Sequence, residues 1–409
     1  MIKYLYRKNG FIIFSLSFIG LLISFFFNED GNGGGARGDF EVTYGFILAL
    51  QENLLADPKD WTLIHTPLHF VLLSFVTRLV EEPSALRFLY CIFSISLPIL
   101  LYLIFCNFYK DKIYRENFFI LAACIFFIPS FRYTSIWASD LITSLIFFTA
   151  SVFFYKKWES SNSRNLDKNI LLQTFLLVLA TYTRQYFAVF FIYFLYEYYK
   201  KIKLKSFLKL LGLCVISSIP VFLYTYKFPE LLTGQHISIQ ALNYFPLGNS
   251  SIVSITLFPV IFINFLYKRI DYNKFIFSSL ISLFIVFILS LNFYPNNWQG
   301  GGINFFLSQK LFNNHLYFYF TSFFTISVFI YLFLENKKNL IIILILMFMF
   351  FSFQVYQRYY DPMFFLIFFT IFKTDLTKVF FTIKNASLLL LLYFIFYYLF
   401  AVSDLIYQI

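Results

Sequence analysis

Charge is scarce in this sequence: Asp, Glu, Lys and Arg make up 13% of its 409 residues, whereas 60% of the residues are hydrophobic and 24% are aromatic. The mean hydropathy is +0.73. A soluble domain of this composition would expose extensive apolar surface to water, so the composition excludes a soluble globular protein. The sequence therefore predicts an all-α protein that crosses a membrane many times.

Cysteine and long polar segments are also lacking. All four cysteines lie within apolar runs, and none has the paired spacing of a metal or redox motif. They are interpreted as small buried hydrophobic side chains. The Gly-rich stretch at 31–38 lacks the Lys-Ser/Thr pair of a phosphate-binding P-loop. Because no internal repeat and no long polar stretch is present, residues 1–409 are predicted to form one membrane domain without a soluble domain.

The few basic residues occur in short clusters between the apolar runs, as in Lys200–Lys209 and Lys373–Lys384. Short loops rich in Lys and Arg stay on the cytoplasmic side, so these clusters predict the orientation. The net charge of +11 could indicate nucleic acid. However, basic residues at span ends contact membrane lipids instead, so we expect no nucleic-acid partner. The apolar segment 11–27 precedes Asn28-Glu29-Asp30 rather than a small-residue cleavage pattern, and is interpreted as a retained first span.

The lengths of the apolar runs predict about 13 spans, with the N-terminus cytoplasmic and the C-terminus outside. The candidate spans are 10–27, 86–109, 117–131, 137–155, 169–182, 186–199, 206–226, 251–267, 275–294, 316–334, 340–356, 359–372 and 386–402. Thr66–Val80 is also apolar, but a crossing there would turn every later Lys cluster outward. We interpret it as an amphipathic helix on the outer face, within a first extracytoplasmic loop at 28–85 that carries interfacial helices.

In this topology the outer side has few Lys but most of the Arg. The outer Arg residues are Arg37, Arg78, Arg87, Arg132, Arg184 and Arg358. Arg presents a planar fork that binds phosphate or carboxylate at two points. This distribution indicates a site for an anionic lipid headgroup; the alternative is that Arg side chains extend from helix ends to the membrane surface.

Two outer positions carry groups suited to acid-base chemistry. Asp39 follows the first span and opens an amphipathic segment, a place that suits either a general base or a helix N-cap. Glu41 is a second carboxylate nearby. His65, just before Pro67, could be a proton shuttle, a phosphate contact, a metal ligand or a solvated interfacial side chain.

Three further outer segments hold Arg next to acids or amides: 132–140, 183–185 and 357–361. Asp140 suits an N-cap, but an acid at the bilayer edge is costly and is expected to serve a function. In the last segment, Arg358 and Asp361 are expected to pair or to face a ligand phosphate. We predict that one pocket at the outer face contains Asp39, His65, Asp140, Arg184 and Arg358.

The order of these motifs resembles the integral-membrane glycosyltransferases of the GT-C superfamily. That superfamily includes the protein O-mannosyltransferases, the lipid A aminoarabinose transferases and the glucosyltransferase that adds the last glucose to the N-glycan precursor. The matching segments are Asp39–Tyr44, Trp61–Leu68, Arg87, Tyr133–Asp140, Arg184-Gln185 and Arg358-Tyr359-Tyr360. The similarity covers about residues 1–200 and then only the Arg358 motif. Phe40 separates Asp39 from Glu41, where the family commonly has adjacent acids, and His65 stands where some branches have Glu.

The resemblance implies a GT-C-like fold and transfer of a sugar, with inversion, from a polyprenyl-phosphate carrier at the outer (periplasmic or lumenal) face. The acceptor would be a glycan, a lipid or a protein, and Asp39 would be the general base. The residues expected to bind the donor and its phosphate are His65, Asp140, Arg132, Arg184, Arg358 and Glu41. A divalent cation is compatible with this chemistry, but the sequence does not require one. The expected location is a bacterial inner membrane, with the endoplasmic reticulum membrane as the alternative.

Two other functions would also use Arg on the outer face. One is a transporter or flippase of a lipid-linked saccharide, and the other is a membrane polysaccharide polymerase or ligase. A transporter would be expected to place ionisable residues or Gly and Pro breaks at mid-membrane. Charges within the apolar runs are nearly absent, which favours the transferase.

Overall fold

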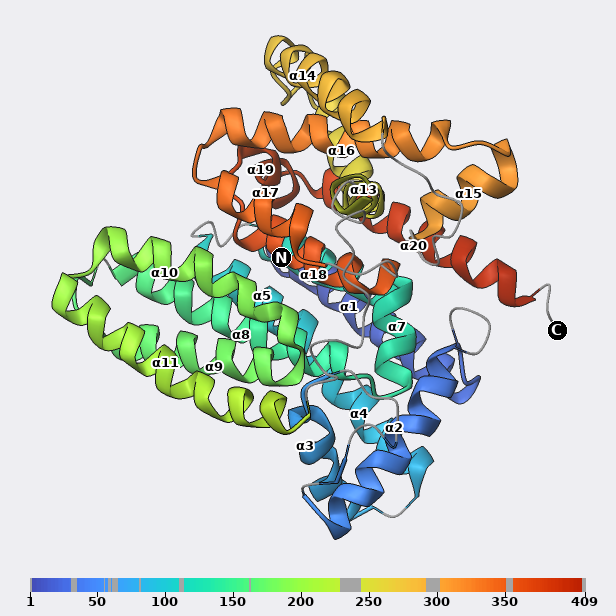
Figure 1. Cartoon of the computed structure of the whole chain (residues 1–409). Helices are drawn as coiled ribbons and strands as arrows, with labels where there is room; N and C mark the ends of the chain where they lie inside the picture. Colours follow the sequence, from blue (N-terminus) through green and yellow to red (C-terminus); the bar gives the residue numbers. More distant parts are fainter. Residues whose placement is uncertain are drawn as a thin grey trace. The chain divides into compact units, whose positions relative to one another are not determined.

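The computed structural model describes residues 2–30, 35–54, 56–57, 60, 65–80, 82–109, 114–161, 163–228, 244–291, 302–350 and 356–406. Within these ranges the regular structure consists of helices and contains no strand, as predicted (Figure 1). The helices form two compact units. The first unit is Met1–Gly234 with Phe394–Ile409, and the second unit is Gln235–Tyr393.

The first unit contains the helices on which most of the predicted site residues lie. They are α1 (Ile2–Phe26), α2 (Gly35–Glu52), α3 (Leu68–Thr77), α4 (Pro83–Ser94), α5 (Ser96–Phe108), α6 (Arg115–Cys124), η3 (Ile125–Phe127), α7 (Pro129–Ile136), α8 (Asp140–Ser161), α9 (Lys168–Thr183), η4 (Gln185–Val189), α10 (Phe190–Lys201) and α11 (Leu204–Lys227). The end of α20 (Lys384–Ile406) also belongs to it. α8 packs against α5 and α9, and its residues Leu141, Ile142 and Leu145 are fully buried.

The second unit is built around α13, which packs against α16, α17 and α18. Its elements are α13 (Tyr244–Leu266), α14 (Tyr272–Ser290), α15 (Gly302–Phe312), α16 (Leu316–Glu335), α17 (Asn339–Phe348), α18 (Gln357–Thr370), η6 (Asp375–Thr377), α19 (Lys378–Thr382) and the start of α20. Small polar side chains join its helices. Asn304 Nδ2, for example, donates to the Ser251 carbonyl at 2.6 Å, and Ser282 Oγ donates to the Phe323 carbonyl at 2.8 Å. Such bonds are typical of helices that pack without water between them.

Seven helices of the described residues are long and apolar enough to cross a membrane. They are Asn9–Phe26, Pro83–Phe108, Leu204–Lys227, Pro246–Leu266, Tyr272–Ser290, Leu316–Glu335 and Lys384–Val402. An eighth span arises if Arg115–Phe127 and Pro129–Ile136, which are bent by 68°, are counted together. The structure thus supports a helical membrane protein, but not the predicted 13 spans.

Most of the surplus in the prediction comes from apolar helices that are too short. α9, α10, α17 and α18 have 16, 12, 10 and 14 residues. A crossing needs about 20 residues, so these helices are short of it. α8 has 22 residues, which is long enough to cross, with Asp140 at its start and Lys156 and Lys157 toward its end.

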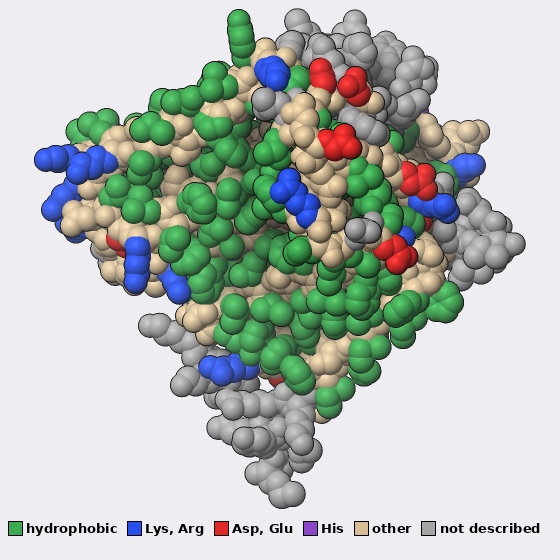
Figure 2. Space-filling view, turned by 90° about the horizontal axis from the view of Figure 1, so that it is seen from below, with side chains coloured by type: hydrophobic (Ala, Val, Ile, Leu, Met, Phe, Trp, Pro, Cys, Tyr) green, Lys and Arg blue, Asp and Glu red, His purple; other side chains and the backbone are tan. Residues whose placement is uncertain are grey.

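Two of the seven spans are hardly covered by protein. Only 6% of the α11 span and 17% of the α14 span is buried, against 78% of the α13 span. Figure 2 shows a face of the molecule on which apolar side chains cover wide areas and charged ones are few. Exposed apolar helices of this length would be unfavourable in water and are suited to contact with lipid.

The segment predicted to lie on the membrane surface forms α3, a helix of ten residues. At 1.5 Å per residue it measures about 15 Å, roughly half the hydrocarbon thickness of a bilayer. α3 packs against α2, and its buried side includes His69, Phe70 and Leu73, whereas Phe75 is exposed. Its length agrees with the prediction that the segment does not cross.

Candidate functional site

Asp140 and Arg184 meet in the interior of the first unit. Nη2 of Arg184 donates to Oδ1 of Asp140 at 2.6 Å, and the two side chains are only 3% and 6% exposed. Asp140 is the first residue of α8, where the helix dipole favours a carboxylate. Arg184 lies in extended backbone between α9 and η4. Two predicted motifs, 44 residues apart in the chain, thus form one buried ion pair.

His65 adds a third predicted residue to this pair. It is half-buried, and its charge interacts with that of Asp140. The next residue, Thr66, donates from Oγ1 to the carbonyl of Thr181 at 3.0 Å, which ties this segment to the end of α9. Residues 61–64, the first part of the predicted Pro-containing motif, lie outside the described residues.

The positive groups around Asp140 keep it ionised. Burial would by itself raise the pKa of this carboxyl group, but the charge of Arg184, followed by that of His65 and by the hydrogen bond from Arg184, outweighs burial. The pKa of Asp140 is therefore held below its ordinary value of 3.8. At neutral pH the site contains a carboxylate bound to a guanidinium, with an imidazole beside it.

His69 has a role that the sequence analysis missed, because it was treated as part of a surface helix. It is 1% exposed. Its Nε2 lies 2.9 Å from the carbonyl oxygen of Ala138, and its Nδ1 lies 2.9 Å from Oγ1 of Thr143. Burial lowers the pKa of His69 to about 4, so the imidazole is neutral at pH 7. The signal in the sequence that could have indicated this role was a lone His within the apolar run 68–77.

Asp39 and Glu41 lie on the exposed side of α2. Asp30, not Asp39, accepts the backbone N–H groups of the first turn, from Ala36 at 3.1 Å and from Arg37 at 2.9 Å. Asp39 is therefore a helical residue rather than an N-cap, and the role of general base stays a prediction. Glu41 accepts from Nε of Arg37 at 2.9 Å in an exposed pair.

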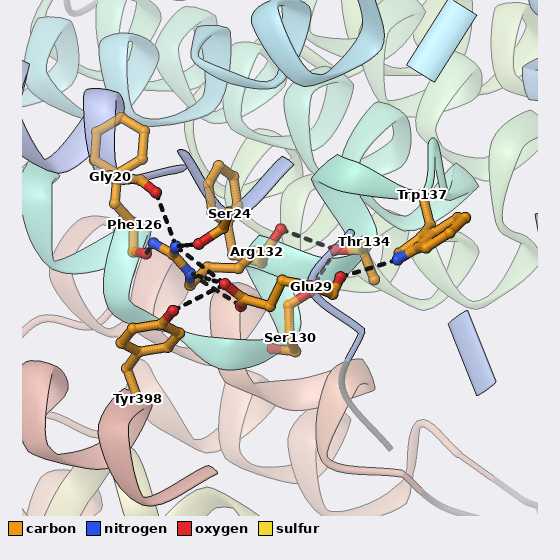
Figure 3. A network of polar contacts seen from close by, with 10 residues as sticks. Gly20, Ser24, Glu29, Phe126, Ser130, Arg132, Thr134, Trp137 and Tyr398 are labelled. Atoms are coloured by element: carbon orange, nitrogen blue, oxygen red, sulfur yellow. Dashed lines mark hydrogen bonds and ion pairs between the residues drawn. The ribbon is translucent and has the colours of Figure 1, made fainter. Parts of the chain in front are cut away.

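Arg132 is held by contacts inside the first unit (Figure 3). Its Nε donates to Glu29 Oε1 at 3.1 Å, and its Nη2 donates to the Gly20 carbonyl at 3.1 Å and to Ser24 Oγ. Its guanidinium also lies over the ring of Tyr398, 4.2 Å from the centroid. Its Nε, Nη1 and Nη2 atoms all donate to groups of the protein itself, so we leave Arg132 out of the proposed donor site.

The bend in the chain before Arg132 explains why an Arg side chain is needed at this position. Pro129 has no backbone N–H, so the helix is interrupted after η3 and carbonyl groups at its end lose their regular partners. Nη1 of Arg132 donates to one of them, the Phe126 carbonyl, at 3.0 Å. A buried carbonyl without a partner would be costly, and Arg132 removes that cost.

Arg358 is the second residue of α18, in the second unit, and is half-buried. Its guanidinium lies 5.3 Å from the ring centroid of Tyr356 and 5.7 Å from that of Tyr359. Asp361 accepts a hydrogen bond from Gln357. The contacts described above bring together three of the five residues of the predicted pocket: His65, Asp140 and Arg184. The placement of Asp39 and Arg358 in that pocket stays a prediction.

Among the described residues, no group of three or more His, Cys, Asp or Glu side chains is arranged to hold a metal ion. No protein-family model, no curated protein and no solved structure matches the chain.

Proposed function

We propose that this protein is a membrane glycosyltransferase that moves a sugar from a polyprenyl-phosphate carrier to an acceptor at the outer face. The observation that carries the proposal is the ion pair between Asp140 and Arg184 with His65 beside it. These residues come from three motifs of the resemblance, and the fold brings them together. A bacterial inner membrane is the proposed location.

The chemistry of the donor suits these surroundings. The isoprenoid tail needs an apolar solvent, and the exposed helices α11 and α14 indicate that lipid surrounds the protein. The carrier phosphate needs cationic side chains, and these are found where the polar residues of the candidate site gather. Arg184 carries five N–H donors, so its bond to Asp140 is compatible with a second bond to phosphate.

In the proposed reaction the acceptor hydroxyl attacks the anomeric carbon of the sugar, and its proton passes to the Asp39 carboxylate. The bond between the anomeric carbon and the phosphate oxygen breaks, which leaves an additional negative charge on the carrier phosphate. Arg184 and His65 would stabilise that charge as it develops. Asp39 is exposed to solvent on α2, which suits a base that receives an aqueous acceptor.

The test is to incubate the purified protein with a panel of radiolabelled prenyl-phosphate sugars and to follow release of prenyl phosphate. Turnover of at least one donor is expected, and no turnover with any donor would contradict the proposal. Asp39→Asn should abolish transfer while leaving folding intact. Glu52→Gln is the matched control, because Glu52 is an exposed carboxylate at the end of the same helix and lies outside the proposed site.

The donor contacts are tested separately. Arg184→Ala and Arg358→Ala should each raise the KM for the donor. Replacement of either residue by Lys should restore only part of the affinity, because the planar fork is lost. Unchanged donor affinity in an Ala variant would contradict the assignment of that Arg residue to donor binding.

Transport of a lipid-linked saccharide is a second candidate, favoured by one feature of the second unit. Asp361 is buried in α18 directly before Pro362, which lies inside that helix. A buried acid beside a helix-breaking residue is typical of transport pathways. Movement of a labelled donor across proteoliposomes without cleavage of the sugar-phosphate bond would favour this function over the transferase.

A further inference from the structure

The turn that leads into Asp140 has an unfavourable backbone conformation. Ala138 has a φ of +48°, in the left-handed region that residues other than Gly rarely adopt. The backbone N–H of Ser139 donates to the Thr134 carbonyl at 2.9 Å, so α7 ends in a Schellman-type C-cap, in which the left-handed position is usually Gly. A left-handed Ala persists only where the surrounding structure stabilises it.

Two side chains from other helices stabilise this turn by binding its carbonyl groups. Nε2 of His69, on α3, lies 2.9 Å from the Ala138 oxygen. The hydroxyl of Tyr90, on α4, donates to the Ser139 oxygen at 2.5 Å. Both side chains are buried, at 1% and 4% exposure. The two residues directly before Asp140 are therefore held by contacts that span distant parts of the first unit.

Thr143, one turn into α8, connects the two side chains. Its Oγ1 lies 2.9 Å from Nδ1 of His69 and 2.8 Å from the hydroxyl of Tyr90. Its backbone N–H donates to the same Tyr90 oxygen at 3.1 Å. His69 and Tyr90 thus contact both the turn before Asp140 and the first helical turn of α8, which ties the start of α8 to α3 and α4.

The hydrogen bonds also determine which nitrogen of His69 carries the proton. A backbone carbonyl only accepts, so Nε2 must be the protonated nitrogen that faces Ala138. In the neutral ring Nδ1 is then an acceptor, and the Thr143 hydroxyl is its donor. Both ring nitrogens are satisfied in this one tautomer.

We propose that His69 is a positioning residue: as the Nε2–H tautomer, and together with Tyr90, it holds the 137–139 turn so that Asp140 faces Arg184. The part of the inference that concerns donor binding rests on the proposed function. The part that concerns the tautomer and the ion pair does not, because it follows from the contacts of His69, Tyr90 and Thr143 alone.

The first test needs no substrate and uses the full-length protein in detergent micelles. The ¹⁵N chemical shifts of the His69 ring at pH 7 should report a neutral ring with the proton on Nε2. The guanidinium resonances of Arg184 should shift in His69→Phe, which keeps an aromatic ring but removes both nitrogens. They should stay unchanged in the control His315→Gln, which alters a half-buried His of the second unit. A charged ring, an Nδ1–H tautomer, or Arg184 resonances that His69→Phe leaves in place would overturn the proposal.

The second test measures sugar transfer by the same variants. His69→Phe should raise the donor KM roughly tenfold, because the Ala138 carbonyl loses its hydrogen bond from His69, with little change in kcat. His69→Gln should recover part of the loss, because its amide N–H can reach the Ala138 carbonyl. If no donor is turned over, the proposed function fails while the tautomer and the Arg184 resonances still decide the positioning role. An unchanged KM in His69→Phe would remove the link between that role and donor binding.

Discussion

Nη2 of Arg184 lies 2.6 Å from Oδ1 of Asp140, and both side chains are almost completely buried. Two charges withdrawn from water in this way depend on each other, because either one alone would be left in a medium that solvates it poorly. This dependence makes the pair a structural element as well as a candidate binding site, and it can be measured.

Removal of one partner of this pair should destabilise the protein more than removal of both. Asp140→Asn or Arg184→Met alone leaves an uncompensated buried charge, at a cost of about 3–5 kcal/mol. The double variant leaves no uncompensated buried charge. Thermal unfolding in detergent should therefore give a higher Tm for the double variant than for either single variant. A double variant whose loss equals the sum of the two single losses would show that the groups are not coupled.

Stability should decrease when the pH falls below 6.5. The pKa of His69 is lowered to about 4 by burial, so between these values the unfolded chain binds the proton and the folded chain does not. The full effect amounts to about 3 kcal/mol. Below about pH 3.8 a further loss is expected, because the pKa of Asp140 is also depressed in the folded state. Tm measured against pH should fall through the first window in the native protein but less in His69→Gln. Equal slopes in the two proteins would contradict the assignment to His69.

Arg132 should matter for stability rather than for donor affinity. Tyr398→Phe removes the hydroxyl that donates to Glu29 Oε2 at 2.8 Å but keeps the ring under the guanidinium, so it should cost about 1 kcal/mol. Arg132→Lys should cost more, about 3 kcal/mol, because an ammonium group cannot replace the forked contacts with Glu29 and the Phe126 carbonyl. Chemical denaturation in detergent measures both losses. A large rise in donor KM for Arg132→Lys at unchanged stability would return this residue to the donor site.

Two glycines of α1 should respond in opposite ways to substitution. A Cβ at Gly10 would lie 2.7 Å from the backbone oxygen of Glu116, so Gly10→Ala forces α1 away from α6 and should cost about 1–3 kcal/mol. Gly20 is the matched control, because no atom lies within 4 Å of its added Cβ. Ala is the better helix former, so Gly20→Ala should be neutral or slightly stabilising. The Tm values of the two variants compare them directly, and equal values would argue against the close approach at Gly10.

The predicted orientation can be tested with single cysteines at exposed sites. Leu79, just after α3, is 87% exposed, and Lys157 on α8 is also exposed. A membrane-impermeant maleimide should label Leu79→Cys from outside, and Lys157→Cys only after the membrane is permeabilised. The half-buried native Cys106 and Cys214 are replaced by Ser in both proteins to remove background. Labelling of both positions from the same side would contradict the assigned topology.

Much of the fold could be predicted from the sequence, but the number of spans could not. The charge pattern and the apolar runs place helices such as α1, α11 and α16 correctly, because an isolated apolar run of about 20 residues has few alternatives to a helix in lipid. The same runs do not distinguish a helix in lipid from one covered by protein. α17 and α18 are apolar for this second reason, since half of the residues of α17 and most of those of α18 are buried against neighbouring helices.

The candidate site shows a similar division. Asp140, Arg184 and His65 stood out in the sequence as polar groups at the ends of apolar runs, and the fold brings them together. The sequence suggested Asp39 as a possible N-cap, but α2 begins at Gly35, and Asp30 accepts its first N–H groups instead. The role of His69 depended on Ala138, a partner 69 positions away.

By itself, the sequence determined that this protein is helical and suited to a membrane, because composition and the length of apolar runs act locally and need no partner. Only the tertiary structure decided that Arg184 binds Asp140 while Arg132 is held by Glu29. These choices are hydrogen bonds across 44 and 103 residues, and such bonds depend on how helices pack rather than on the pattern within any one of them.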